Sequence, residues 1–199
     1  MTLPRPLDRS ALPADTAALA RYLIGKIVVR ALPEGVASGR IVETEAYVVG
    51  DAAGHGYRGI TPRNRSLFLE RGHAYVYVAY GVANMLNVSS EGPGVGVGVL
   101  VRALEPLEGL AVMRSNRGLE RLRDLTTGPG KLCTALRIDR SLDGLDLCSE
   151  GPLWLGDDGR VVGEIGDSVR IGITKDADLR LRFYLRGSAF VSGPKSLNP

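Results

Sequence analysis

The sequence predicts a single α+β domain with a largely antiparallel β-sheet. Its 199 residues are 44% hydrophobic and 24% charged, which is typical of a soluble globular chain that buries one core. Strand patterns joined by short turns alternate with a few helix patterns, and strands joined in this way pair as antiparallel hairpins. Because no repeat, low-complexity tract or linker divides the chain, we expect one domain over residues 1–199, with loose termini at 1–14 and 193–199.

The charged residues and cysteines narrow the classes of partner and site. The formal net charge is +3, and 21 of the 25 basic residues are Arg. Arg suits bidentate binding of phosphate, although GC-rich coding produces the same bias. Cys133 and Cys148 form no CxxC pair, which argues against a disulfide framework or a structural zinc site. With no signal-peptide core and no run near the ~20 apolar residues of a membrane span, we expect a soluble cytoplasmic protein.

One helix and two strands are expected first. Asp15 can cap a helix that ends near Leu23, and Gly25 offers its stop. β-branched residues then predict strands over 26–32 and 39–49, joined by the six residues between them. The chain therefore opens with a helix followed by a hairpin.

The second of these strands carries a cluster of polar side chains. Successive side chains of a strand point to opposite faces, so Glu43, Glu45 and Tyr47 share one face with Ile41. The other face is apolar or small and holds Val42, Thr44, Ala46 and Val48. An amphipathic surface strand would account for Glu43 alone. Glu45 beside Tyr47, with His55 in the Gly-rich loop that follows, indicates a carboxylate and an aromatic ring converging on a pocket.

Two arginines occupy an unusual position after that loop. Thr61 and Pro62 predict the start of a short helix ending near Gly72, with Arg63 and Arg65 in its first turn. The helix dipole disfavours cations there, but a bound phosphate would reverse that preference. Two solvated arginines are the alternative.

The next segment predicts a tyrosine-rich hairpin. Its strands are expected over 74–80 and 85–89, with Tyr75 and Tyr77 on one face and Tyr80 beside the turn. A large aromatic at a hairpin tip has little core to enter. It could act as a wedge in a base stack, or it could lie on neighbouring surface.

A glycine-rich strand follows. In GPGVGVGVLVR, the alternation puts Gly94, Gly96, Gly98 and Arg102 on one face. Glycine in a strand often marks close approach by a ligand or another backbone. Arg102 therefore projects from the end of a cleared face, unless the face is simply packed tightly and Arg102 pairs with an acid.

Helices and short strands complete the chain. Pro106 predicts the start of a helix through about Arg117, and the Gly-Pro-Gly before Lys131 predicts a second helix whose start is similar to a phosphate site. Short strands are expected around Leu153, Val162, 169–173 and 181–185.

Seven blocks of this sequence resemble one known family. GRIVETEAY, TPRNR, YVYVAYG, NVSS, VRALEPLEG, GPGKLCTAL and RFYLRGS lie in this order between residues 19 and 192. Together they resemble the alkyladenine DNA glycosylases, also called methylpurine or 3-methyladenine DNA glycosylases of the mammalian type. The resemblance implies a curved sheet with a protruding hairpin, and an enzyme that removes damaged purines and so begins base excision repair.

The resemblance also implies roles for single residues. Glu45 matches the general base that activates water, and Arg102 matches a residue that positions this water. The spacing of Glu43 and Glu45, roughly 6.6 Å along a strand, leaves a two-carboxylate mechanism open, because inverting sugar hydrolases separate their carboxyls by about 6.5–9.5 Å. The resemblance favours Glu43 as support.

Further roles concern the base and the DNA. Tyr47, His55 and Tyr77 match the walls around a flipped base, Asn87 matches a residue that discourages guanine, and Tyr80 matches the inserted side chain. The residues expected at DNA phosphates are Arg63, Arg65 and Lys131.

The implied enzyme is monofunctional and needs no metal or other cofactor. It would act as a monomer on double-stranded DNA that contains alkylated purines, with deaminated purines as further candidates, and on the nucleoid if bacterial. Two features depart from the family pattern: the hairpin tip is small at Val82, and EGPGVGVGV is about two residues longer, which affects the approach to Arg102.

Two rival functions are also compatible with the sequence. One is a nucleic-acid-binding module that has lost its chemistry, against which the retained Glu45 argues. The other is an enzyme that hydrolyses free nucleosides or small glycosides through Glu43 and Glu45, and it gives Tyr80 no role.

Overall fold

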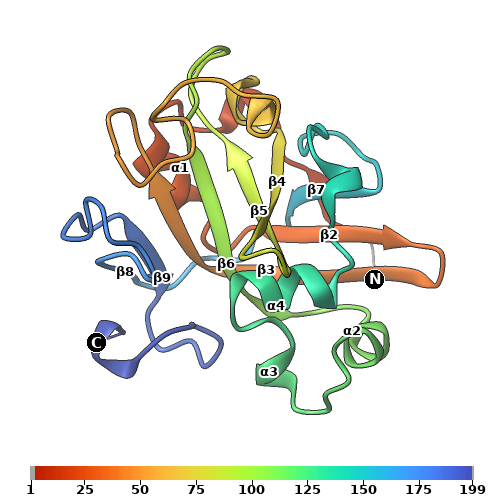
Figure 1. Cartoon of the computed structure of the whole chain (residues 1–199). Coiled ribbons are helices and arrows are strands. Elements are labelled where there is room, and N and C mark those ends of the chain that lie inside the picture. The colour runs from red at the N-terminus through yellow and green to blue at the C-terminus, as the bar shows by residue number, and fades with distance from the viewer. Residues whose placement is uncertain (1–2, 199) are drawn as a thin grey trace.

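A curved sheet of nine strands organises the molecule in the computed structural model, which describes residues 3–198 (Figure 1). The strand order is β1-β7-β2-β3-β6-β5-β4, and β9 pairs with β3 and β8. All pairings are antiparallel, which confirms the predicted single α+β domain with a largely antiparallel sheet. The strands are β1 (Arg5–Pro6), β2 (Ile27–Leu32), β3 (Gly35–Tyr47), β4 (Ala74–Ala79), β5 (Ala83–Ser89), β6 (Gly98–Pro106), β7 (Leu153–Asp157), β8 (Ile165–Ser168) and β9 (Arg182–Leu185).

The helices are short and pack around this sheet. The α-helices are α1 (Thr16–Leu23), α2 (Leu110–Arg117), α3 (Leu122–Thr126) and α4 (Pro129–Ala135). The 3-10 turns are η1 (Arg9–Ala11), η2 (Arg65–Phe68), η3 (Arg140–Leu142) and η4 (Lys195–Leu197). Leu23 of α1 and Leu132 of α4 lie in the same buried core as Val88 of β5 and Leu104 of β6. None of the helices in the described part of the chain is long and apolar enough to cross a membrane.

The first helix and hairpin form largely as predicted. Asp15 caps α1, because its carboxylate accepts a hydrogen bond of 2.7 Å from the amide of Ala18. The hairpin is tighter than predicted: β3 begins at Gly35, directly opposite Leu32, so two residues rather than six connect the strands. The positive φ of 130° at Gly35 closes this turn.

The alternation expected along β3 breaks at one point. Its register against β6 shifts between Ile41 and Glu43, and again between Glu43 and Thr44. Ile41 consequently shares the main core with Ala46, instead of sharing a face with Glu43 as predicted. Such irregularities re-aim side chains, and this one lies next to the two carboxylates.

Other predicted boundaries are wrong for local reasons. The helix expected from Thr61 to Gly72 shrinks to η2, because the hydroxyl of Thr61 bonds the side chain of Asn64 at 2.9 Å instead of capping a helix. Arg63 therefore precedes the helical turn, and Arg65 is its first residue.

The later elements also shift. Pro106 ends β6 opposite Gly39, and α2 begins only after Gly109, whose positive φ of 73° admits the turn. The strand expected around Val162 is absent from the described residues, and the one expected at 169–173 is β8, a few residues earlier.

The first and last segments of the described residues, 3–198, pack against the sheet. At the N-terminal end, β1 pairs with β7, and Leu7 and Leu12 are buried. At the C-terminal end, Arg182 of β9 donates hydrogen bonds to the carbonyl of Ser192 at 3.1 Å and to the side chain of Asn198 at 2.7 Å.

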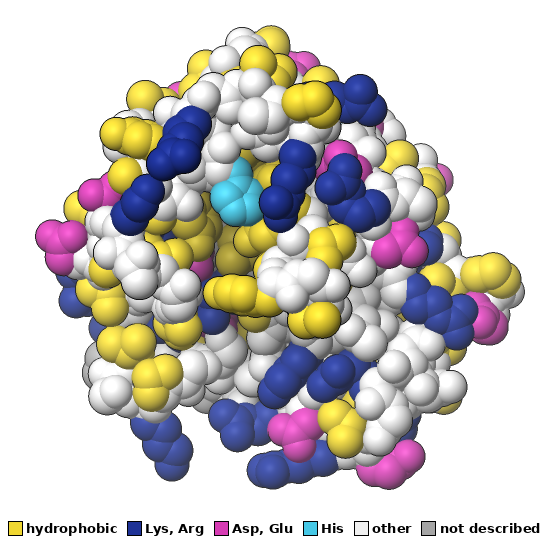
Figure 2. Space-filling view, in the orientation of Figure 1, with side chains coloured by type: hydrophobic (Ala, Val, Ile, Leu, Met, Phe, Trp, Pro, Cys, Tyr) yellow, Lys and Arg dark blue, Asp and Glu magenta, His cyan; other side chains and the backbone are white. Residues whose placement is uncertain are grey.

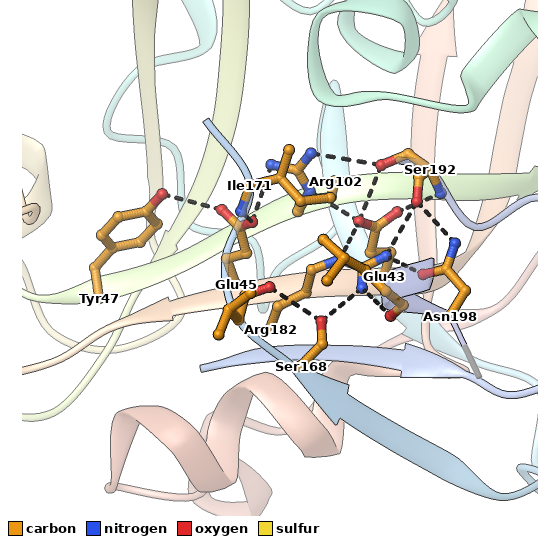
Figure 3. A network of polar contacts seen from close by, with 11 residues as sticks. Glu43, Glu45, Tyr47, Arg102, Ser168, Ile171, Arg182, Ser192 and Asn198 are labelled. Atoms are coloured by element: carbon orange, nitrogen blue, oxygen red, sulfur yellow. Dashed lines mark hydrogen bonds and ion pairs between the residues drawn. The ribbon is translucent and has the colours of Figure 1, made fainter. Parts of the chain in front are cut away.

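Glu43 joins this C-terminal segment to the sheet (Figure 3). Its carboxylate accepts hydrogen bonds from Arg102 at 2.8 Å, from Arg182 at 2.7 Å, and from the amide and hydroxyl of Ser192 at 2.7 and 2.9 Å. Burial disfavours the charged form, but Arg102 and Arg182 outweigh it and hold the pKa of Glu43 below its usual range. Glu43 is therefore a buried anion that ties β3, β6, β9 and the C-terminal segment together.

Gly56→Ala tests a close approach between two loops. A methyl group at Gly56 would lie 1.9 Å from the carbonyl oxygen of Gly96, whereas one at Gly92 would meet nothing within 4 Å. We expect Gly56→Ala to lower the free energy of unfolding by about 1–3 kcal/mol, as overpacking does, and Gly92→Ala to change it by less than about 0.5 kcal/mol. Urea unfolding measures both, and equal stabilities would contradict the prediction.

Glu43→Gln tests the buried anion through its pH dependence. At neutral pH we expect a loss of about 3 kcal/mol of unfolding free energy, because two buried guanidiniums lose a shared charge. A lowered folded pKa contributes stability above the unfolded pKa, about 4.3, and this contribution is lost as the pH falls through the folded pKa. The difference between the wild-type protein and the variant should therefore shrink below about pH 4. Urea unfolding between pH 3 and 7 measures it, and a difference that did not vary with pH would refute the prediction.

Candidate active site

A cavity of about 480 Å³ opens over the strands β3, β6, β5 and β4. Seven of the ten residues predicted for the site line it: Tyr47, His55, Arg63, Tyr77, Tyr80, Asn87 and Arg102. In Figure 2, Lys and Arg side chains flank a histidine on the face shown, and the surface beside it is hollowed. The sheet therefore brings together residues that are far apart in the sequence.

Glu45 lies directly behind the cavity wall. Its side chain is 0% exposed, and three groups that line the cavity bind its carboxylate. The amide of Ile171 donates to Oε1 at 2.7 Å, the hydroxyl of Tyr47 donates to Oε2 at 3.0 Å, and Nη1 of Arg102 lies 3.1 Å from Oε1 (Figure 3). These donors fix the orientation of the carboxylate. A carboxylate that is held in this way can act as a general base if a water molecule lies within hydrogen-bond reach.

Arg102 lies between the two carboxylates of β3. Its Nε donates to Glu43 at 2.8 Å while its Nη1 contacts Glu45. Burial opposes the charge, but Glu45 and Glu43 together raise the pKa of this guanidinium. The sequence left open whether Arg102 projects from a cleared face or pairs with an acid. In the structure it pairs with two acids and also lines the cavity.

Aromatic side chains form the walls of the cavity. Tyr47 ends β3 and Tyr77 lies on β4, with β6 and β5 between them. Three strand spacings separate them by about 14 Å in a flat sheet and by less in a curved one, which leaves room for a planar ring. Tyr77 stacks on Tyr75 with ring centroids 5.4 Å apart, and His55 meets Tyr77 edge-on at 4.3 Å.

Burial affects the protonation of this wall. Burial and then the charge of Glu45 raise the pKa of Tyr47, so its hydroxyl stays protonated and donates to that carboxylate. Although His55 reaches the surface, partial desolvation of its ring and the charge of Arg63 lower the pKa of the imidazole. The wall is therefore composed of neutral rings near pH 7.

The loop that carries His55 has its own support. Nδ1 of His55 lies 2.8 Å from the hydroxyl of Tyr75. The amide of Asn64 donates to the carbonyls of His55 at 2.8 Å and of Gly59 at 3.1 Å. Asn64 and Tyr75 thus place His55 at the mouth of the cavity.

Asn87 lies on β5 in the floor of the cavity. Its Nδ2 donates to the carbonyl of Tyr75 at 3.1 Å, and the residue is 6% exposed. Because the amide nitrogen faces β4, the orientation of the side chain is set by the sheet itself.

Tyr80 projects from the hairpin between β4 and β5. The side chain is 87% exposed, and the backbone is left-handed with φ of 53°. The connection is three residues, 80–82, rather than the predicted 81–84. A non-glycine residue with positive φ is uncommon, and such residues occur in tight turns and at functional sites.

The predicted phosphate contacts occupy different places. Arg63 is exposed at the cavity mouth and donates to the carbonyl of Val78 at 3.0 Å. Arg65 and Lys131 are exposed and lie outside the set of residues that line the cavity.

The sequence patterns missed two buried arginines that contact Tyr47 and Glu43. Arg170 binds Asp51 with both side chains fully buried, and its guanidinium lies 4.7 Å from the ring centroid of Tyr47. Arg182 holds Glu43. These pairs join residues more than one hundred positions apart, so no local pattern could reveal them. The one available signal was that Arg182 begins RFYLRGS, a block that resembles the family.

The positions of the acidic side chains bear on two other kinds of chemistry, a two-carboxylate mechanism and a metal site. Glu43 does not line the cavity, and its two oxygens are already bound by Arg102, Arg182 and Ser192, which argues against a two-carboxylate mechanism. Within residues 3–198, no group of three or more His, Cys, Asp or Glu side chains could hold a metal ion.

Comparisons with known proteins agree on one family. A family model described as methylpurine-DNA glycosylase matches residues 10–189. A protein of Mesorhizobium japonicum is 77% identical over 192 residues, which cover 96% of this chain and 92% of the relative. A protein of Paraburkholderia phytofirmans is 51% identical over 96% of this chain and 90% of the relative. A protein of Methanoculleus marisnigri is 47% identical over 89% of this chain and 94% of the relative.

All three relatives are named "Putative 3-methyladenine DNA glycosylase". The family model covers most of the chain, and the alignments with the relatives cover nearly the whole length of each relative. The resemblance read from the seven sequence blocks is therefore confirmed. This chain belongs to the methylpurine-DNA glycosylase family, whose members are DNA repair hydrolases acting on N-glycosyl bonds.

Proposed function

We propose that this protein flips alkylated purines out of double-stranded DNA and hydrolyses their N-glycosidic bond with a water activated by Glu45. The observation that carries the proposal is the carboxylate of Glu45, oriented by three donors directly behind an aromatic cavity.

The size and shape of the cavity favour a single flipped base. A base stacked in a duplex cannot present its C1′ to water, so it must leave the helix at a cost of a few kcal/mol. A volume of about 480 Å³ lies within the usual range for a ligand site. Tyr80 at the exposed hairpin tip can fill the gap left in the stack and so offset part of this cost.

The aromatic walls favour cationic purines. Alkylation at N3 or N7 leaves a positive charge on the base, and a tyrosine face attracts a cation by roughly 0.5–2 kcal/mol. Tyr47 and Tyr77 offer two such faces. No Asp or Glu among the described residues lines the cavity to act as a general acid. Alkylated purines, which leave without protonation, are therefore the primary substrates, and deaminated purines such as hypoxanthine are slower ones.

The chemistry needs only water and Glu45. Cleavage passes through an oxocarbenium-like sugar, whose charge an ionised Glu45 stabilises while it takes a proton from the attacking water. Arg102, beside the same carboxylate, positions the water. No lysine of the described chain lines the cavity to form a Schiff base, which supports a monofunctional reaction without strand cleavage.

The basic surface supplies the contacts to DNA. Arg63 at the cavity mouth and the exposed Arg65 and Lys131 can bind phosphates, so binding should weaken steeply with salt. One chain carries all these groups. We therefore propose that it acts as a monomer, and on the nucleoid in a bacterial cell.

Glu45→Gln tests the general base. Single-turnover excision is measured on a duplex oligonucleotide carrying 7-methylguanine or 1,N6-ethenoadenine. We expect a loss of at least about 1,000-fold, within the usual range for general-base catalysis, because the amide cannot accept the proton. Glu105→Gln, the same substitution at a position that does not line the cavity, should keep the wild-type rate. Excision by Glu45→Gln at the wild-type rate would reject Glu45 as base, and tight binding of lesion DNA by the wild-type protein without any abasic product would reject the enzymatic function.

Tyr80→Ala tests the wedge. We expect about a tenfold loss of excision from duplex DNA, in line with stacking energies of about 1–3 kcal/mol, and little loss from a single strand that carries the same lesion. Tyr80→Phe keeps the ring and should retain the rate. Equal rates for Tyr80→Ala and the wild-type protein on duplex DNA would contradict the wedge.

A further inference from the structure

We propose that Glu43 is a positioning residue of the active site that fixes the guanidinium of Arg102. Ser192 of the C-terminal segment supports this contact by binding Glu43. This inference rests on the proposed roles of Glu45 and Arg102. It assigns a function to a carboxylate that does not reach the cavity and to a segment that the sequence suggests is loose.

The geometry of Arg102 carries the first step. Its guanidinium is a rigid planar group, so fixing the direction of one nitrogen fixes the others. Nε is held by Oε1 of Glu43 at 2.8 Å, and Nη1 then lies 3.1 Å from Oε1 of Glu45. The position of the guanidinium beside Glu45 is therefore set by Glu43.

The burial of Glu43 excludes a direct role in the reaction. Its side chain is 0% exposed, and the cavity is lined without it. Oε1 accepts hydrogen bonds from Arg102, Arg182 and the hydroxyl of Ser192, and Oε2 accepts one from the amide of Ser192. Glu43 can influence the substrate only through a neighbour, and Arg102 is the neighbour that lines the cavity.

The balance of charge explains why Arg102 needs a second anion. Glu43 and Glu45 face Arg102 and Arg182, so two negative and two positive charges lie together in the sheet. Without Glu43, Arg102 would turn both of its terminal nitrogens toward Glu45 and close on it as a bidentate pair. Glu43 keeps the guanidinium shared, which leaves part of the Glu45 carboxylate available to a water molecule.

The C-terminal segment completes this arrangement. The amide and hydroxyl of Ser192 bind Glu43 at 2.7 and 2.9 Å, and the hydroxyl also lies 3.5 Å from Nη2 of Arg102 (Figure 3). The carbonyl of Ser192 is held in turn by Arg182 at 3.1 Å and by Asn198 at 3.2 Å. Ser192 is thus positioned from both sides, and it touches both members of the Glu43–Arg102 pair.

The test measures the single-turnover excision rate and the affinity for lesion DNA in Glu43→Gln, Arg102→Gln and the double variant. We expect Glu43→Gln to lower the rate about tenfold or more while affinity changes less than about twofold, because the lost interaction acts on the chemical step. In the Arg102→Gln background, Glu43→Gln should have no further effect. Rate losses that multiply in the double variant would overturn the inference, since they would show that Glu43 acts independently of Arg102.

A milder variant keeps the inference testable if Glu43→Gln does not fold. Ser192→Ala removes one hydroxyl from Glu43 and Arg102, and we expect a loss of about threefold in rate while the melting temperature falls by only a few degrees, so that the variant stays folded. Ser188→Ala, in the same segment, removes a hydroxyl that binds only the amide of Phe190 among the bonds described and should leave the rate unchanged. A wild-type rate in Ser192→Ala would overturn the inference.

The same measurements separate this inference from the proposed function. If the wild-type protein releases no base, the proposed function fails and the inference fails with it. If the wild-type protein is active and Glu45→Gln is inactive, but folded Glu43→Gln excises at the wild-type rate, only the positioning role of Glu43 is overturned.

Discussion

Four buried charges, two carboxylates and two guanidiniums, lie side by side where β3 runs between β6 and β9, and the site depends on their balance. Glu43 and Glu45 come from one strand, and Arg102 and Arg182 from its two neighbours. An ion pair of this kind contributes little net stability, but the loss of one partner leaves an uncompensated buried charge. The four positions are therefore tied to one another, and only one edge of the cluster faces the cavity.

The order of the strands places this cluster beside the cavity in which we propose that the base binds. Arg102 on β6, Asn87 on β5 and Tyr77 on β4 lie in sequence across the sheet from Tyr47 on β3. The groups to which we assign roles in the reaction thus lie on paired strands, which hold their side chains rigidly. Tyr80 and the loop around His55, which would meet the DNA, lie on turns at the surface, where a scaffold commonly carries its contacts with partners.

Local signals in the sequence predict local structure well and longer elements less well. The cap at Asp15 and the tyrosine hairpin depend on neighbours within a few residues, and both form as expected. The helix expected at Thr61 does not form, because the side chain of Asn64 competes for the same backbone and hydroxyl groups. The break in alternation at Glu43 arises from pairing with β6, which the pattern of β3 alone does not contain.

The sequence by itself determined the family, the sheet-rich fold, and the presence of a carboxylate and aromatic rings for a pocket, because blocks and periodicity are properties of neighbouring residues. The periodicity of β3 did not distinguish Glu43 from Glu45, since residues two apart on a strand are equivalent by period, and only the family resemblance favoured Glu45 as the base. The tertiary structure gave the physical difference between their surroundings. Arg182 and Ser192, 139 and 149 positions away, bind Glu43, whereas the amide of Ile171 binds Glu45 at the cavity wall, so distant packing rather than local pattern decided which acid lies beside the cavity.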